Sequence, residues 1–208
     1  MPLILGIDEA GRGALCGPMV IAGAMINEKE QKKLKELGVK DSKLLSPSQR
    51  ERIRASLEGL VKYVVFEVQP KEIDENNLNK LELDYFAKVI NSFDADKVFV
   101  DAIEKNTSKV KSAILKRVGK PLKLIAENKA DSKYLIVGAA SIIAKTLRDK
   151  RIEELKQRYG EIGSGYPSDP STIKFVENWV KKNRFIPTFV RKKWSTLDSL
   201  KQRKLGEF

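Results

Sequence analysis

The sequence predicts an α/β fold in which a central mixed five-stranded β-sheet is flanked by helices. Five short stretches rich in apolar and β-branched residues recur along the chain, and most are separated by longer segments with helical spacing of apolar residues. The first stretch, residues 3–7, is a continuous apolar run, which is typical of a strand buried on both faces of a sheet. With 208 residues, 41% of them hydrophobic, the chain is long enough to bury such a sheet.

The predicted strands are short, and the second is expected to pair with the first. The first ends in two adjacent carboxylates, Asp8 and Glu9, and the fourth ends in Asp101. Pro70 ends the third, because proline has no N–H to donate to a neighbouring strand. In chain order, the predicted strands cover residues 3–7, 19–26, 61–68, 97–100 and 122–126.

Capping residues mark several predicted helices. Ser46, followed by Pro47 and then by Gln49 three residues on, forms a capping-box pattern. Asp131 and Asp169 stand at the expected starts of two later helices, where a carboxylate accepts hydrogen bonds from backbone N–H groups. The predicted helices cover residues 28–37, 47–60, 71–93, 107–118, 132–158 and 170–182.

The charge of the chain favours a polyanionic partner. Lys and Arg number 40 against 28 Asp and Glu, so the net charge is +12, as in proteins that bind nucleic acid or an anionic membrane. Residues 171–208 hold ten basic and three acidic residues, which is +7 of that +12. Because aromatic residues are interleaved with these charges, we expect a catalytic domain over 1–170 and a basic helical extension over 171–208 that packs on it.

The residue types present restrict the chemistry. The chain has no histidine and one cysteine, Cys16, which excludes Ser-His and Cys-His catalysis, histidine-ligated zinc, cysteine metal clusters and an internal disulfide. Any metal must be held by oxygen, which points to Mg²⁺ or Mn²⁺. No signal peptide or membrane span is expected, because Asp8 interrupts the first apolar run and no apolar run approaches the ~20 residues of a span. We expect a cytoplasmic protein.

Carboxylates follow the predicted strands at places that the fold can bring together. If the first and fourth strands are parallel neighbours, Asp8 and Asp101 meet at one edge of the sheet, and Asp131 reaches the same edge from the next helix start. Glu9 joins them only if the strand distorts, because successive strand residues face opposite ways. Such carboxylates repel one another, and divalent cations resolve the repulsion and support phosphodiester cleavage.

Plainer interpretations stay open at this point. An apolar run followed by Asp8 and Glu9 is also what a strand ending in a polar turn looks like. Asp131 alone is also what an ordinary N-cap looks like. The glycine loop that follows, Gly11-Arg12-Gly13, favours a site, because backbone without side chains can approach another molecule closely.

Six motifs follow one another in a fixed order along nearly the whole chain. They are GIDEAGRG at 6–13, GVKDSK at 38–43, the strand-end Asp101, KADSKYLIVGAASIIAK at 129–145, GSGYPSD at 163–169 and RKKWST at 191–196. Any one of them is weak evidence, but the ordered set resembles type 2 ribonuclease H (ribonuclease HII), and in particular its archaeal branch.

The resemblance implies a ribonuclease H-like fold and endonucleolytic hydrolysis of RNA in RNA–DNA hybrids and of ribonucleotides embedded in duplex DNA. It implies a two-metal-ion mechanism with Mg²⁺ or Mn²⁺ that leaves 5′-phosphate and 3′-hydroxyl ends. Carried over by position, the catalytic and metal-binding set is Asp8, Glu9, Asp101 and Asp131. The carried-over substrate contacts are Gly11, Arg12 and Gly13 at the ribose 2′-OH, Tyr166 against the sugar beside the junction, and Lys43, Ser141 and Lys145 at the backbone or phosphates.

Two other functions fit parts of the sequence. A non-catalytic nucleic-acid binder would share the basic charge but would have no use for four clustered acids. Another nuclease or integrase of the same fold would share the acids, but the Gly-Arg-Gly loop together with Tyr166 argues against it. A monomer is expected, with a replication clamp as a further partner.

Overall fold

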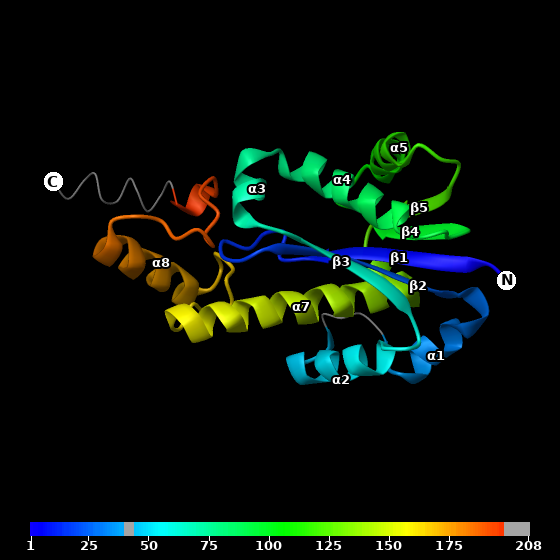
Figure 1. Ribbon diagram of the computed structural model, residues 1–208, viewed down its shortest axis with the longest axis horizontal. Helices are drawn as coiled ribbons and strands as arrows, with labels where there is room; N and C mark the ends of the chain where they lie inside the picture. The colour runs from blue at the N-terminus through cyan, green and yellow to red at the C-terminus, as the bar shows by residue number, and fades with distance from the viewer. Residues whose placement is uncertain (40–43, 198–208) are drawn as a thin grey trace. The chain divides into compact units, whose positions relative to one another are not determined.

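The computed structural model describes residues 1–39 and 44–197, whose strands form a five-stranded sheet in the order β3-β2-β1-β4-β5 (Figure 1). β2 is antiparallel to the central β1, whereas β4 is parallel to both β1 and β5. The predicted mixed sheet, and the parallel pairing of the first and fourth strands, are therefore confirmed. The bounds are β1 Leu3–Ala10, β2 Met19–Asn27, β3 Lys62–Val68, β4 Lys97–Asp101 and β5 Lys123–Glu127.

The chain divides into two compact units. The first contains Met1–Ala10, Val20–Glu67 and Leu78–Leu147, and the second contains Gly11–Met19, Val68–Asn77 and Arg148–Phe208, described up to residue 197. Each unit is assembled from stretches that are distant in sequence. The division predicted at residue 170 stays a prediction.

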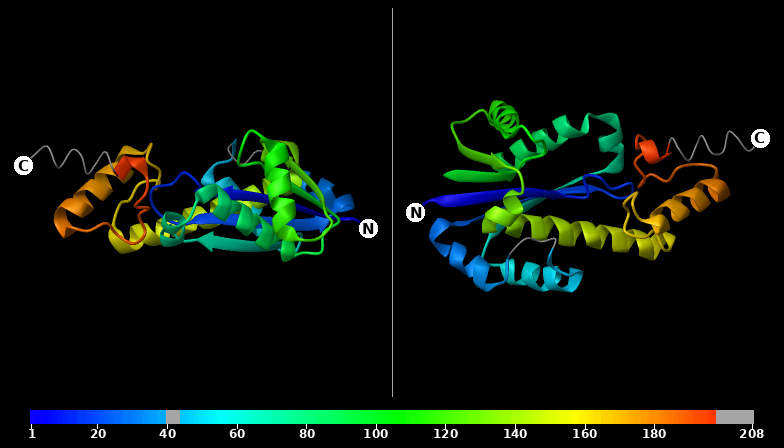
Figure 2. Two further views of the ribbon diagram at one scale, coloured as in Figure 1. Left: turned by 90° about the horizontal axis from the view of Figure 1, so that it is seen from above. Right: turned by 180° about the vertical axis from the view of Figure 1, so that it is seen from behind.

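Two glycines allow helices to lie close against the sheet of the first unit. A Cβ on Gly6 of β1 would overlap the backbone of Ile136 and Val137 at the start of α7, Leu135–Tyr159. A Cβ on Gly23 of β2 would overlap the side chain of Val89 in α4, Leu78–Asn91. Helix α7 therefore covers one face of the sheet and α4 the other, as the different views also show (Figures 1 and 2).

The predicted capping residues of the helices are confirmed more often than the predicted helix lengths. Ser46 and Gln49 form the predicted capping box, and the predicted helix over 107–118 is confirmed. The predicted helix over 71–93 is wrong, because the chain leaves helical geometry at Asn76 and forms two helices. The first-unit bounds are η1 Glu28–Glu30, α1 Gln31–Glu36, α2 Pro47–Leu57, α4 Leu78–Asn91, α5 Thr107–Val118 and α6 Ala130–Lys133.

The second unit is built around the C-terminal segment. It contains α3 (Pro70–Glu75), the end of α7 and α8 (Pro170–Asn183), which Asp169 caps as predicted. A buried cluster joins the two ends of the chain, from Leu15 and Cys16 to Val176, Phe189 and Val190. Within the described residues, no helix has the length and apolar character needed to span a membrane.

Candidate active site

The register of the sheet brings two of the predicted acids together. In the parallel pair of β1 and β4, Ile7 lies beside Val100, so the next residues along the two strands are Asp8 and Asp101. Both carboxylates lie at the same end of the β1–β4 pair because the two strands are parallel and in register there, although β1 continues to Ala10. This is the arrangement expected from the apolar runs that precede each acid.

Asp131 reaches the same place by a route that the sequence analysis described wrongly. The predicted helix over 132–158 is two helices, since Tyr134 is extended and separates α6 from α7. Asp131 does not cap a helix start, because it lies inside the first turn of α6 and the N-cap residue is Lys129, in left-handed geometry with φ 58°. The Asp101 carboxylate takes that role, and its Oδ1 accepts a hydrogen bond of 3.0 Å from the Ala130 N–H.

The three carboxylates form a group that suits a divalent cation. One oxygen from each of Asp8, Asp101 and Asp131 lies within 4.8 Å of the others. Asp8 and Asp131 are 4% and 3% exposed, so water screens their charges poorly. Three converging carboxylates in a shielded position are hard oxygen ligands, which Mg²⁺ and Mn²⁺ prefer.

The electrostatics at Asp8 show why the site needs a cation. Burial raises the pKa of the Asp8 carboxyl well above its usual range, and the charges of Glu9 and Asp101 raise it further. A hydrogen bond from Ser141 and the charge of Lys145 lower this pKa and offset part of the rise. A divalent ion would remove the remaining cost of ionising Asp8.

Glu9 lies on the opposite face of β1 from Asp8. The pairing of β1 with β2 continues without a bulge to Ala10, so the strand makes no distortion that would turn the two side chains to one side. Glu9 is accordingly not among the three carboxylates whose oxygens lie within 4.8 Å of one another in the described part of the chain, although its charge raises the pKa of Asp8 more than that of Asp101 does. Its role as a metal ligand stays a prediction.

Ser141 and Lys145 lie one turn apart on α7 and are connected to Asp8. Ser141 is fully buried and hydrogen-bonds to the Asp8 carboxylate, while the Lys145 Nζ donates to the Ser141 Oγ over 2.9 Å. The two side chains therefore form a hydrogen-bonded chain that supports the ionised form of Asp8. Of the predicted contacts, Lys43 lies outside the described residues.

The glycine loop of the second unit is held in a turn. Gly11 has φ 78°, and its carbonyl accepts a hydrogen bond of 3.2 Å from the Ala14 N–H. A Cβ on Gly11 would come within 2.9 Å of the Pro18 carbonyl oxygen, whereas a Cβ on Gly13 would meet nothing within 4 Å. Gly11 is therefore needed for the turn itself, while Gly13 leaves space beside the loop.

Tyr166 belongs to a second glycine-containing loop of the same unit. The Arg148 guanidinium lies over its half-buried ring, 4.4 Å from the ring centre, in a cation–π contact. Arg148 also donates a hydrogen bond of 2.5 Å to the Ser164 carbonyl. The Leu15 and Cys16 N–H groups donate to the Gly165 carbonyl, so this loop is bonded directly to the chain that follows Gly13. The prediction missed Arg148, which sits in an ordinary helical segment and carries no local signal.

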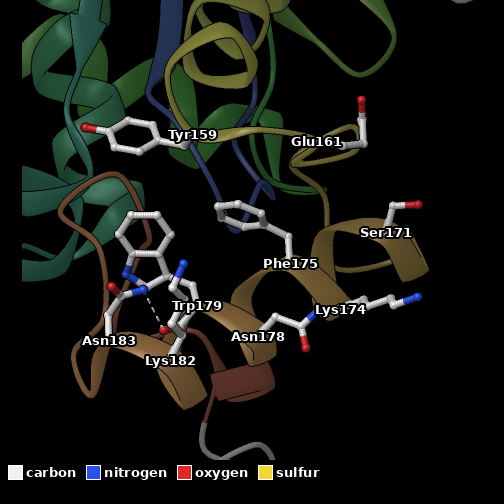
Figure 3. Close-up of a pocket in the computed structure, with 9 residues that line it drawn as sticks. All are labelled: Tyr159, Glu161, Ser171, Lys174, Phe175, Asn178, Trp179, Lys182 and Asn183. Atoms are coloured by element: carbon white, nitrogen blue, oxygen red, sulfur yellow. Dashed lines mark hydrogen bonds between the residues drawn. The ribbon is translucent and has the colours of Figure 1, made fainter.

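A pocket in the second unit lies along α8 (Figure 3). Its volume is about 640 Å³, and the residues that line it include the aromatic residues Tyr159, Phe175 and Trp179 and two basic residues, Lys174 and Lys182. Tyr159 and Trp179 are in edge-to-face contact at 5.6 Å, so the interleaved aromatic residues of the basic segment pack, as the sequence predicts.

The sheet order and the carboxylate group define the class of protein. A mixed sheet whose parallel central strands end in acids that can hold divalent cations is the architecture of a metal-dependent nuclease of the ribonuclease H-like fold.

Comparisons with known proteins identify the family within that class. The family model described as Ribonuclease HII matches residues 5–197. Ribonuclease HII of Thermococcus sibiricus is 47% identical over 203 residues, which cover 95% of this chain and 91% of that protein. The chain belongs to the ribonuclease HII family, as its motifs predict, and is a metal-dependent endoribonuclease that cleaves the RNA strand of RNA–DNA hybrids.

Solved structures agree with the fold. The crystal structure of the ribonuclease H2 from Pyrococcus horikoshii OT3 is 45% identical with a TM-score of 0.91, and the match covers 97% of this chain and 98% of that one. The structure of the PCNA:RNase HII complex from Archaeoglobus fulgidus contains a chain that is 37% identical with a TM-score of 0.89, covering 99% of this chain and 100% of that one.

Proposed function

We propose that this ribonuclease cleaves both continuous RNA–DNA hybrids and single ribonucleotides embedded in duplex DNA, by a two-metal-ion mechanism that leaves 5′-phosphate and 3′-hydroxyl ends. The observation that carries the proposal is the group formed by Asp8, Asp101 and Asp131, whose oxygens lie within 4.8 Å of one another. Glu9 is the proposed fourth acid, which its effect on the Asp8 pKa supports.

The acids have separate tasks in this mechanism. Asp8 and Asp131, both buried, would hold the cations, and bound cations would supply an activated water and stabilise the leaving oxygen. Asp101 fixes the start of α6 through its Oδ1 and also contributes an oxygen to the acidic group. Ser141 and Lys145 favour the ionised form of Asp8, and Lys145, a partly exposed residue, is also a proposed phosphate contact together with Lys43.

Substrate choice is assigned to the two loops of the second unit. Gly11, Arg12 and Gly13 are the proposed readers of the ribose 2′-OH, since the open space beside Gly13 lets a sugar approach the backbone. Tyr166 is the proposed contact to the sugar next to the junction, where an aromatic ring disfavours an additional hydroxyl. With these two roles, an enzyme that cleaves RNA–DNA hybrids would also recognise a single ribonucleotide in DNA.

Two features concern partners. The relative from Archaeoglobus fulgidus was solved in complex with PCNA, and its similarity supports the proposal that this chain also works with a replication clamp. The protein itself is proposed to act as a monomer.

One assay tests the proposed function. The protein is incubated with a DNA duplex that carries one ribonucleotide, with Mg²⁺ or with Mn²⁺, and the cut ends are mapped. We expect one cut beside the ribonucleotide, with 5′-phosphate and 3′-hydroxyl products, and no cut in the all-DNA duplex. A cut at a random position, or a 2′,3′-cyclic phosphate end, would contradict the mechanism.

Asp101→Asn is the matching inactive variant. The asparagine oxygen can still accept the Ala130 N–H bond, so the variant removes the charge and keeps the start of α6. The control is Asp84→Asn, because this carboxylate is also hydrogen-bonded, to Arg117 at 2.6 Å, but lies outside the acidic group. Cleavage by Asp101→Asn at the rate of the control would exclude the metal-site assignment.

A further inference from the structure

The largest fully buried side chain of the described residues is a charged one, Arg191, in the C-terminal RKKWST motif. Its guanidinium donates to backbone carbonyl oxygens of the glycine loop and of the residues that follow it. Nη2 bonds to Gly11 at 2.6 Å, Nη1 bonds to Arg12 at 2.7 Å, and Nε and Nη2 bond to Gly17 at 3.3 and 3.1 Å. One side chain therefore holds three carbonyls that lie about 180 positions away in the sequence.

Burying this cation is costly, and its hydrogen-bond partners are neutral. Burial and the nearby charge of Arg148 lower the pKa of Arg191 to about 10, so the group still carries its charge at neutral pH. A buried charge without a bonded carboxylate is less favourable than an apolar side chain of similar size. The benefit of Arg191 is geometric, because its planar fork of donors fixes several acceptors at once.

The residues around Arg191 fix it in turn. The Asp74 carboxylate accepts the Lys192 and Lys193 N–H groups at 2.8 and 3.1 Å, and so holds the chain directly after Arg191. The ring of Trp194 lies 5.0 Å from the Arg191 guanidinium carbon, and its Nε1 donates to the Gly13 carbonyl over 3.4 Å. All three carbonyls of the Gly-Arg-Gly loop are thus bonded from the same segment.

The direction of these carbonyls determines where the loop's donors point. The chain contains no cis peptide bond in its described part, and in a trans peptide the N–H and the C=O point in opposite directions. Because the Gly11 and Arg12 carbonyls face Arg191, the N–H groups of Arg12 and Gly13 face away from it. A Cβ on Gly13 would meet nothing within 4 Å, so the loop is also uncrowded at this residue.

We propose that Arg191, with Trp194 beside it, is the positioning residue for ribose recognition: it orients the Gly11-Arg12-Gly13 backbone so that the loop can read a 2′-OH. The inference rests on the proposed function, since it assigns a role in the reading of the ribonucleotide. Arg191 acts through the loop and need not touch the substrate. Its loss should therefore weaken the distinction between ribose and deoxyribose more than it weakens duplex binding.

The test is a binding cycle with two variants and two duplexes, in the inactive Asp101→Asn background and with Mg²⁺ present. The dissociation constant is measured for a DNA duplex with one ribonucleotide and for the all-DNA duplex of the same sequence. Arg191→Lys keeps the charge but loses the fork, and Arg191→Met loses both. We expect Arg191→Lys to lower the preference for the ribonucleotide duplex by about fivefold to tenfold, the loss of roughly one hydrogen bond. Its affinity for the all-DNA duplex should change by less than about twofold.

A destabilised control separates positioning from folding. Val176→Ala creates a cavity in the buried cluster of the second unit, and this side chain makes none of the hydrogen bonds to the glycine loop's carbonyls. The variant should lower the melting temperature and leave the duplex preference unchanged. An equal loss of affinity for both duplexes in Arg191→Lys, or an unchanged preference, would overturn the inference. If the protein with Arg191 intact shows no preference, the loop does not read ribose and the inference also fails. Cleavage of the ribonucleotide duplex by the unmodified protein tests the proposed function separately.

Discussion

The acidic group of the first unit and the glycine loop of the second unit are held by different means. Asp8 and Asp101 are placed by the register of two buried parallel strands, so backbone pairing alone determines where their carboxylates lie. The Gly11-Arg12-Gly13 loop lies outside any strand, and its carbonyls are held by the side chains of Arg191 and Trp194. A site built on a sheet depends on the packing of the whole core, whereas a loop held by one side chain depends on that side chain.

The largest effect is expected in the acidic group. Asp8→Asn should lower kcat by at least about a thousandfold, since a metal ligand contributes several kcal/mol to the transition state. It should also abolish the rise in melting temperature that Mg²⁺ gives by binding the folded state only. Steady-state cleavage assays and thermal melts with and without Mg²⁺ provide the measurement, and a variant that keeps both properties would remove Asp8 from the metal site.

The same variant should be more stable than the unmodified protein when no metal is present. The folded-state pKa of Asp8 is raised by burial and by Glu9, so its contribution to stability is complete below the unfolded pKa of ~3.9 and is lost as pH rises through the folded pKa. Melts in EDTA should therefore agree at about pH 4 and favour Asp8→Asn increasingly toward neutral pH. Each kcal/mol of relief corresponds to about 2–4 °C. A difference that is independent of pH would show that Asp8 is not the group concerned.

The next effect concerns the sheet that holds the acids. Gly6→Ala would place a methyl group against the backbone of Ile136 and Val137, which cannot move aside as a flexible side chain can. We expect a loss of about 3 kcal/mol or more in the free energy of unfolding, measured in urea. Gly59→Ala serves as the control because a Cβ there meets nothing within 4 Å, although its φ of 79° adds a smaller strain. Equal losses in the two variants would show that strain at glycine, and not the contact with α7, is responsible.

A smaller effect is expected at the second loop. Tyr166→Ala should lower kcat/KM on a single embedded ribonucleotide by about tenfold, if ~1–3 kcal/mol of ring contact is lost. The loss should be smaller on a continuous RNA–DNA hybrid, in which no deoxyribose follows most ribonucleotides. Steady-state kinetics on both substrates, with circular dichroism to confirm folding, gives the ratio. Equal losses on both substrates would remove Tyr166 from junction recognition.

The smallest change compares the two glycines of the first loop. Gly13→Ala should leave the melting temperature within about 2 °C, because its methyl group enters open space, yet lower activity by about fivefold if a sugar needs that space. Gly11→Ala should instead lower stability by about 1–2 kcal/mol, because φ 78° and the Pro18 carbonyl both oppose a side chain. Full activity in Gly13→Ala would show that the substrate does not approach the loop there.

The sequence allowed Asp8 and Asp101 to be predicted because each of these acids follows a local signal, whereas the signal at Asp131 was misread as a helix cap. Apolar runs predicted the strands that end at Asp8 and Asp101, and parallel pairing then brought the two acids together. The side of Glu9 was harder to predict, because it depends on whether β1 distorts, and the pairing shows that it does not. The family resemblance supplied the identities of the loops, which no periodicity indicates.

The features that the sequence did not predict depend on hydrogen bonds between residues that are distant in sequence. The break at Tyr134 follows a short helix whose first N–H is bound by Asp101, 29 positions earlier, whereas the sequence alone predicted one helix over residues 132–158. Arg191 and Arg148 also carry no local signal, because each acts on carbonyls that its neighbours in sequence do not reveal. The RKKWST motif indicated that the segment matters but not what it holds.

The bond between Asp101 and the Ala130 N–H gives the site an internal spectroscopic reporter. The amide proton of Ala130 is bound to an oxygen of a carboxylate that is proposed to hold a cation, so its chemical shift and its hydrogen-exchange rate depend on how that carboxylate is engaged. Titration of Mg²⁺ against isotopically labelled protein would thus follow occupancy of the site through one backbone signal, without a substrate and without turnover.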